Sequence, residues 1–234
     1  MTLLPENFDL HNVDFDALYQ GGQLLEGVDL PSIPWDIGAA QPVVIEAERA
    51  GRFRGAVVDV GCGLGDNAIF LAGQGHQVTG VDAAATALEH AGQRARERGV
   101  VVEFTVADAT SLAGFEGRFD SALDAACYHC LDEEARHAYA AALHRATRPD
   151  ALLTLFCFPA GSTGLAAAMG VSEDNLRTTW GNAGWDITDL RLASYHVNAA
   201  VGELVTAFGL ECEPVPGEPS RLQAPIWALR AHRV

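Results

Sequence analysis

The segment Val57-Val58-Asp59-Val60-Gly61-Cys62-Gly63-Leu64-Gly65-Asp66-Asn67 decides the fold of this chain. A run of apolar residues stops at a glycine-rich turn, and apolar residues at helical spacing follow at once. A second apolar run, Gln77 to Val81, ends in Asp82. A strand, a glycine turn, a helix and a second strand that ends in an acid are typical of α/β proteins that bind the ribose of an adenosyl cofactor.

The glycines of this turn have a mechanical role. A chain that leaves a parallel strand and enters a helix at once needs backbone angles that side chains resist and glycine tolerates. Without side chains, Gly61 and Gly63 also allow a ligand to approach backbone amides at a helix N-terminus. We expect Asp82, with Ala83 beside it, to accept hydrogen bonds from both ribose hydroxyls.

The acid at position 66 separates two kinds of cofactor. The dinucleotide fingerprint has its third glycine there, whereas this chain has Asp66. A carboxylate would repel a pyrophosphate, but it suits the cationic methionyl end of S-adenosylmethionine. The charge therefore favours S-adenosylmethionine over NAD. A tight turn without any ligand is the remaining alternative.

Three motifs together resemble the class I S-adenosylmethionine-dependent methyltransferases: the glycine turn, Val78-Thr79-Gly80-Val81-Asp82, and Val106-Ala107-Asp108-Ala109. The likeness extends along nearly the whole chain. Pro34-Trp35-Asp36-Ile37-Gly38, followed by Gln41-Pro42, is similar to the small-molecule branch near thiopurine and heterocyclic-toxin methyltransferases. The resemblance implies S-adenosylmethionine as the cofactor and S-adenosylhomocysteine as the product.

The resemblance also assigns an expected role to each cofactor-binding residue. Asp59, Gly61 and Gly63 are expected to bind the methionyl end, and Asp82 and Ala83 the ribose. Asp108 and Ala109 are expected to bind the adenine. Asp124 and Cys127 would contact the cofactor from the adjoining loop, and Trp35 would cover it. Two of these residues have an alternative interpretation. Asp108 could cap a turn, and Trp35 could simply anchor the N-terminus by packing.

The composition limits the kinds of partner. A chain of 234 residues that is 49% hydrophobic can bury one sizeable core. Its net charge of −16 makes phosphate backbones and anionic membranes poor partners. The N-terminus does not resemble a signal peptide, and no apolar run approaches the roughly 18 residues of a membrane-spanning helix. We expect a cytoplasmic monomer or weak homodimer without nucleic-acid or membrane partners.

The cysteines do not predict a metal site. The chain has five cysteines, an odd number that does not indicate a disulfide framework. Cys127-Tyr128-His129-Cys130 contains one C-x-x-C pair, but a structural zinc site usually needs two. We therefore expect no bound metal.

Strand and helix patterns alternate along the chain, which predicts an α/β fold with helices on both faces of a mostly parallel sheet. After the first strand, the expected strands cover residues 77–81, 100–106, 119–123, 151–158, 185–197 and 225–231. The methyltransferase resemblance implies a Rossmann-like three-layer sandwich of seven strands, in the order 3-2-1-4-5-7-6 with an antiparallel edge hairpin. We expect a single domain over residues 1–234, with 1–50 as an N-terminal lid and 51–234 as the cofactor-binding core.

The segment from Asp120 to Cys130 is expected to meet the substrate, because Asp124 stands where the fourth strand runs out toward the ligand edge of the sheet. His129 is the candidate catalytic base, since a neutral imidazole accepts a proton near neutral pH. It could equally pack at the start of the next helix. A thiol or hydroxyquinoline-like phenol of low pKa needs no base, and catalysis then depends mostly on alignment.

The sequence as a whole predicts an enzyme that methylates a small molecule. We expect in-line methyl transfer to an O, S or N atom of an aromatic or heteroaromatic acceptor, in a pocket that the lid closes against water. Two alternatives remain at this point: a non-catalytic S-adenosylmethionine-binding protein, and an NAD-dependent oxidoreductase.

Overall fold

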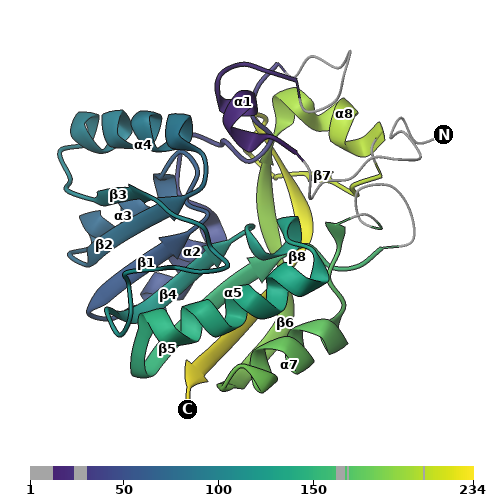
Figure 1. Cartoon of the computed structure of the whole chain (residues 1–234). Coiled ribbons are helices and arrows are strands. Elements are labelled where there is room, and N and C mark those ends of the chain that lie inside the picture. The colour runs from purple at the N-terminus through teal and green to yellow at the C-terminus, as the bar shows by residue number, and fades with distance from the viewer. Residues whose placement is uncertain (1–12, 24–30, 162–166, 168, 208) are drawn as a thin grey trace.

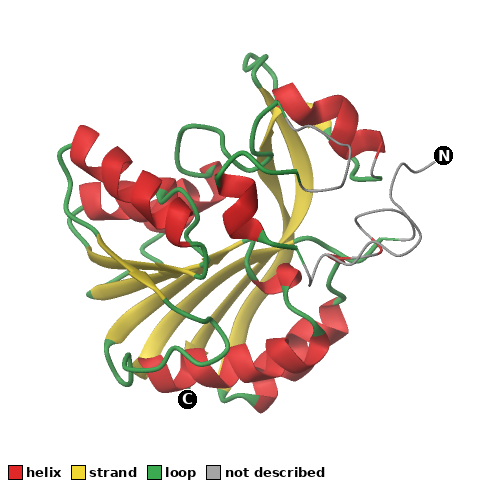
Figure 2. Ribbon diagram, turned by 45° about the horizontal axis from the view of Figure 1, so that its top comes forward, coloured by secondary structure: helices red, strands yellow, loops and turns green. Residues whose placement is uncertain are grey.

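The computed structural model describes residues 13–23, 31–161, 167, 169–207 and 209–234. In these residues one mixed sheet runs through the molecule, and helices cover both of its faces (Figures 1 and 2). Its strands are β1 (Ala56–Val60), β2 (Gln77–Asp82), β3 (Glu103–Val106), β4 (Phe119–Ala125), β5 (Thr147–Cys157), β6 (Trp185–Asn198), β7 (Glu213–Pro214) and β8 (Arg221–Arg233). The predicted α/β three-layer architecture is confirmed.

The strand order also agrees with the prediction. The sheet runs β3-β2-β1-β4-β5-β8-β6, with parallel pairing from β3 to β5. The last long strand, β8, lies antiparallel between β5 and β6, as the expected edge hairpin requires. The structure has one strand more than expected. The two-residue β7 pairs with the first residues of β8, on the edge opposite β6.

The helices follow local signals in the sequence. They are α1 (Phe15–Tyr19), α2 (Pro42–Arg49), α3 (Asp66–Gly73), α4 (Ala85–Glu97), α5 (Glu133–Ala146), α7 (Glu173–Asn182) and α8 (Gly202–Ala207), with short 3-10 turns η2 (Tyr128–Cys130) and η3 (Ala199–Val201). Asp132 caps α5 by accepting from the backbone N–H of Ala135, and Ser172 caps α7 in the same way. Over the described ranges, no helix is long and apolar enough to cross a membrane.

Two apolar clusters fix the layers. One cluster joins α2 and α3 to one face of the sheet, and the other joins α5 and α7 to the opposite face. Trp180 and Trp185 belong to the second cluster and are 0% and 2% exposed. They are core residues, because the helix that carries Trp180 packs under β6 and away from the ligand edge.

The N-terminal part of the chain packs on α4. The side chain of Asp16 in α1 accepts a hydrogen bond from the backbone N–H of Thr86 at 2.8 Å. Thr86 lies in the first turn of α4, whose own N-cap residue, Ala84, has no side-chain acceptor. The first helix thus supplies a cap for a helix of the core. Residues 1–12 and 24–30 of the expected lid lie outside the described part of the chain.

Candidate active site

A cavity of about 430 Å³ opens where the parallel strands end. Most of the predicted site residues line it: Trp35, Gly61, Gly63, Asp82, Ala83, Asp108, Ala109, Cys127 and His129. They come from the N-terminal segment and from the ends of β1 to β4, as expected for a ligand site at the carboxyl edge of an open sheet. Asp59 and Asp124 are the two predicted residues that do not line it.

The glycine turn is packed so tightly that side chains would not fit. Gly61 and Gly63 have φ values of +67° and +51°. A Cβ atom on Gly61 would lie 2.6 Å from the Cβ of Cys127, and one on Gly63 would lie 2.8 Å from the hydroxyl of Tyr19. The two glycines therefore let Cys127 and Tyr19 approach the turn from either side of the cavity.

Asp82 ends β2 beside this turn. One carboxylate oxygen accepts from the backbone N–H of Gly63 at 2.8 Å, and the other accepts from that of Ala84 at 2.9 Å. Burial raises the pKa of this carboxyl above its ordinary value, although the surrounding backbone amides oppose the rise. A carboxylate offers about four acceptor positions, so Asp82 keeps capacity for the hydroxyls of a ribose.

Asp108 caps a turn and also borders the cavity. Its carboxylate accepts from the backbone N–H of Thr110 at 2.8 Å and from the Thr110 hydroxyl, which is the turn-capping interaction. The residue also lines the cavity next to Ala109. The turn cap fixes the position of the Asp108 carboxylate without removing it from the ligand side.

Asp124 holds the loop that follows β4, and it does not line the cavity. It is fully buried, and its carboxylate accepts from the backbone N–H groups of Cys127 at 2.8 Å and Tyr128 at 3.1 Å. Burial raises its pKa to about 7, against the effect of the Cys127 amide. The expectation that Asp124 binds the cofactor directly does not fit this geometry, because the loop amides occupy the carboxylate.

Asp59 is likewise buried beneath the turn, with 1% of its surface exposed. Burial raises its pKa well above the ordinary value, and the charges of Asp124 and Asp82 add to the rise. One of its carboxylate oxygens has no hydrogen-bond partner among the described residues. Asp59 is therefore part of the buried support of the glycine turn and is not placed for direct contact with a ligand in the cavity.

The structure leaves His129 with a hydrogen-bond donor as its remaining ring nitrogen, whereas the sequence suggested that this residue acts as a base. Its Nδ1 atom lies 3.3 Å from the backbone nitrogen of Phe158, which is an obligatory donor. Nδ1 must therefore accept, and the proton of the neutral ring lies on Nε2. Burial lowers the pKa of His129 to about 3, and Arg136 adds to the effect. This environment disfavours uptake of a proton from a substrate.

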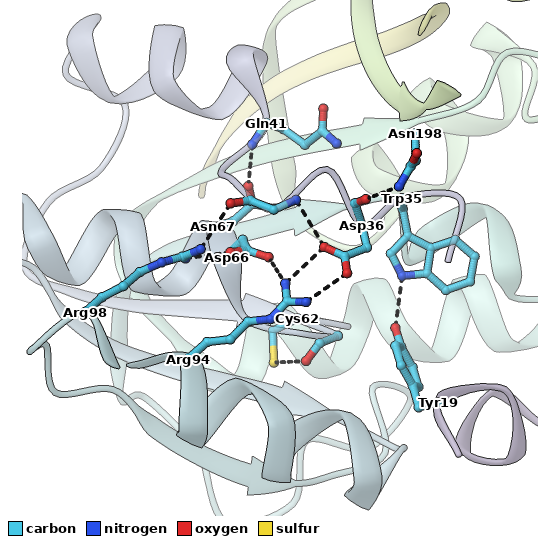
Figure 3. A network of polar contacts seen from close by, with 12 residues as sticks. Tyr19, Trp35, Asp36, Gln41, Cys62, Asp66, Asn67, Arg94, Arg98 and Asn198 are labelled. Atoms are coloured by element: carbon cyan, nitrogen blue, oxygen red, sulfur yellow. Dashed lines mark hydrogen bonds and ion pairs between the residues drawn. The ribbon is translucent and has the colours of Figure 1, made fainter. Parts of the chain in front are cut away.

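Two aromatic side chains from the N-terminal part of the chain lie at the cavity. The indole Nε1 of Trp35 donates to the hydroxyl of Tyr19 at 3.0 Å (Figure 3). The two rings meet edge to face with their centroids 6.2 Å apart, and Phe15 contacts the other side of Trp35. The sequence indicated Trp35 by its motif but gave no specific signal for Tyr19 beyond its being aromatic in a turn-rich stretch.

The carboxylate of Asp66, which was expected to suit a cationic cofactor group, is paired with two arginines, although Asp66 lines the cavity. Its carboxylate lies between the guanidinium groups of Arg94 and Arg98 and forms an ion pair with each (Figure 3). Arg94 lies in the last turn of α4 and Arg98 is the C-cap residue of that helix, and together they neutralise the acid that was expected to attract a cationic cofactor group. The sequence pattern could not predict this pairing, because the arginines lie 28 and 32 residues after Asp66 in the chain.

The second part of the cavity is apolar, and the sequence predicted little of it. Its lining includes Phe158, Met169, Tyr195, Val197, Leu204 and Leu210. They come from the end of β5, from β6, from α8 and from the loops between them. We refer to these six residues as the acceptor half, and to the lining residues between Val60 and Ala109 as the cofactor half.

Comparison with known proteins agrees with this site. Residues 57–150 match a family model described as a methyltransferase domain. The 2-heptyl-1-hydroxyquinolin-4(1H)-one methyltransferase of Mycobacteroides abscessus is 34% identical over 187 residues, which cover 79% of this chain and 81% of that protein.

Solved structures show the same fold. One, from work on the conversion of a disulfide bond into a thioacetal group during echinomycin biosynthesis, is 32% identical with a TM-score of 0.76, over 94% of this chain and 90% of the other. The 1,6-didemethyltoxoflavin-N1-methyltransferase of Burkholderia thailandensis, with bound S-adenosylhomocysteine, shares the fold at 22% identity and a TM-score of 0.60, over 82% and 77% of the two chains. The NAD-dependent alternative is therefore wrong. This chain belongs to the S-adenosylmethionine-dependent methyltransferases.

Proposed function

We propose that this enzyme methylates an O, S or N atom of a small aromatic or heteroaromatic molecule, by in-line displacement in a covered pocket. The observation that carries the proposal is the continuity of the cavity. The cofactor half and the apolar acceptor half belong to one space of about 430 Å³. A volume of this order is typical of sites for small organic ligands.

The acceptor half supports an apolar, flat substrate. Phe158 and Leu210 are each 8% exposed, and the lining around them is mostly aliphatic or aromatic. Two polar side chains, Tyr195 and His129, also line the cavity, and the Phe158 ring contacts both. The relative from Mycobacteroides abscessus is named for a hydroxyquinolone that carries a heptyl chain, and an acceptor of similar polarity suits these residues.

The cofactor supplies an electrophilic methyl group, and the protein supplies binding and alignment. Asp82, Gly61 and Gly63 would hold the ribose and methionyl parts, while Asp108 and Ala109 would border the adenine. Trp35 and Tyr19 would exclude water from the reacting atoms. Holding the two reactants in line at short distance contributes several kcal/mol to such a reaction.

His129 and Cys130, two further residues that line the cavity, are not suited to act as a base near neutral pH. His129 has a pKa of about 3, and burial raises the pKa of Cys130 to about 12. We infer that the acceptor enters already ionised, as a thiol, phenol or N-hydroxy heterocycle of low pKa. The Nε2–H group of His129 would then donate a hydrogen bond to the acceptor and orient it.

The test is a panel of acceptors in pairs that differ in pKa, with the formation of S-adenosylhomocysteine measured against pH. We expect the midpoint of the rate profile to follow the pKa of each acceptor. We also expect His129→Leu to lower kcat about 10-fold without moving that midpoint. A midpoint that stays fixed for all acceptors and disappears in the variant would identify His129 as the base. If wild-type protein binds S-adenosylhomocysteine but methylates none of these compounds, the proposed acceptor class is wrong.

A further inference from the structure

We propose that Arg94, which does not line the cavity, is the residue that positions the cover of the cofactor site. The cover segment is defined here as residues 31–41, which carry Trp35. Arg94 joins this segment to the start of α3, directly after the glycine turn (Figure 3). The proposal rests on the covered pocket described above and names the device that holds the cover in place.

The contact with the cover is a two-point ion pair. The two terminal nitrogens of Arg94 donate to the two carboxylate oxygens of Asp36, at 3.0 and 2.8 Å. Paired Arg–carboxylate bonds of this kind fix orientation as well as distance. Asp36 follows Trp35 directly in the chain, so the pair also fixes the backbone that carries the indole.

The same guanidinium reaches the glycine turn. One of its nitrogens also donates to Asp66, the first residue of α3, and Arg98 pairs with the other oxygen of Asp66. Arg98 further donates to the backbone carbonyl of Gly38 in the cover segment at 3.1 Å. Burial acts to raise the pKa of Asp36, but the hydrogen bonds and charge of Arg94 outweigh it and hold that pKa below its ordinary value.

The opposite side of the cover is held by uncharged groups. Asn198 at the end of β6 donates from its backbone to Pro34 and from its side chain to the carbonyl of Asp36, at 2.8 and 3.0 Å. The side-chain amide of Gln41 exchanges two hydrogen bonds with the backbone of His196, at 2.9 and 3.0 Å. The attachment to β6 is therefore insensitive to charge, whereas the attachment to α4 depends on it.

This asymmetry predicts what the loss of Arg94 does. The cover would stay attached along β6, and it would keep the contacts of Arg98 with Gly38 and of Gln41 with Asn67. It would lose the two-point ion pair next to Trp35 that joins it to α4. Trp35 would then be held less closely over the cofactor half, although every residue that lines the cavity is still present. The binding of S-adenosylhomocysteine should weaken, while the folded core keeps its stability.

The experiment compares the affinity of four proteins for S-adenosylhomocysteine by isothermal titration. They are the wild type, Arg94→Gln, Arg94→Lys and the matched control Arg96→Gln. Arg96 lies on the same helix, is exposed and forms no ion pair within the described residues. We expect Kd to rise about 10-fold in Arg94→Gln, to rise less in Arg94→Lys, and to stay unchanged in the control.

Two further readouts separate positioning from a general loss of structure. The melting temperature without ligand should differ little between Arg94→Gln and Arg96→Gln. The double variant Arg94→Gln/Asp36→Asn should bind no more weakly than Arg94→Gln alone, because both changes remove one interaction. Additive losses, or wild-type affinity in Arg94→Gln, would overturn the proposal. Since no acceptor is needed, the result does not depend on the proposed acceptor class.

Discussion

The two halves of the cavity are built in different ways. The cofactor half comes from strand ends and turns between Val60 and Ala109, where each residue lies close to a glycine or an acid of a recognisable motif. The acceptor half is assembled from Phe158, Met169, Tyr195 and residues of α8, which share no motif. The motifs common to the family thus lie in one continuous stretch, whereas the lining that we propose for the acceptor depends on tertiary packing.

The largest effect is expected from a side chain placed in the glycine turn of the cofactor half. Gly61→Ala puts a methyl group 2.6 Å from Cys127 at a residue with φ of +67°. We expect the affinity for S-adenosylhomocysteine to fall about 100-fold or more, equal to roughly 3 kcal/mol. Titration calorimetry measures this loss. Gly73→Ala is the control, because a methyl group there meets nothing within 4 Å, and its affinity should stay at the wild-type value.

The loop between the two halves gives a pH-dependent test. Asp124 has a pKa of about 7 in the folded protein, against roughly 4 in an unfolded chain. Between these values the folded state holds a proton that the unfolded state lacks, so the contribution of Asp124 to stability falls as pH rises. The slope has an upper limit of about 1.4 kcal/mol per pH unit.

Urea unfolding of wild type and Asp124→Asn between about pH 4 and 7 measures this contribution. The stability of the wild type relative to the variant should decline across the range. Asp120→Asn is the control on the same strand, because Arg148 lowers the pKa of Asp120 and so gives no decline in this range. A constant difference between wild type and Asp124→Asn would show that Asp124 does not hold a proton in the folded protein.

The smallest effect is expected from a change in the acceptor half, and it tests whether the two halves are independent. Leu204→Ala removes apolar contact from the acceptor half only. We expect the KM of an aromatic acceptor to rise about 5-fold, equal to roughly 1 kcal/mol, with no change in the affinity for S-adenosylhomocysteine. Leu192→Ala, at a leucine on β6 that is 55% exposed, should change neither value. Equal losses for cofactor and acceptor would mean that the two halves are not independent.

The sequence predicted the fold well because its strands carry strong local signals. β2, β4 and β6 begin at the residues expected from the apolar patterns. β5 begins earlier than the expected residue 151, because Thr147 already pairs with Phe119 of β4. The helix α7 was missed, since its amphipathic pattern is short and most of its residues are polar.

For the site, the sequence predicted which residues gather but not always what they face. Asp59, Asp66 and Asp124 were all interpreted as acids that meet the ligand. The structure instead pairs Asp66 with arginines, places Asp124 under backbone amides and buries Asp59. The position of an acid in a motif indicates its place at the edge of the sheet, whereas the direction of its carboxylate depends on partners far away in the chain.

The cap that Asp16 provides for α4 makes the amide of Thr86 a built-in reporter. Its hydrogen can exchange with solvent only when the first helix moves away, so its exchange rate counts the openings of the N-terminal part of the chain. The amide of this one residue at the start of α4 would thus record how often the first helix moves away from the site. Saturation with cofactor should slow that rate if opening and ligand release are the same event.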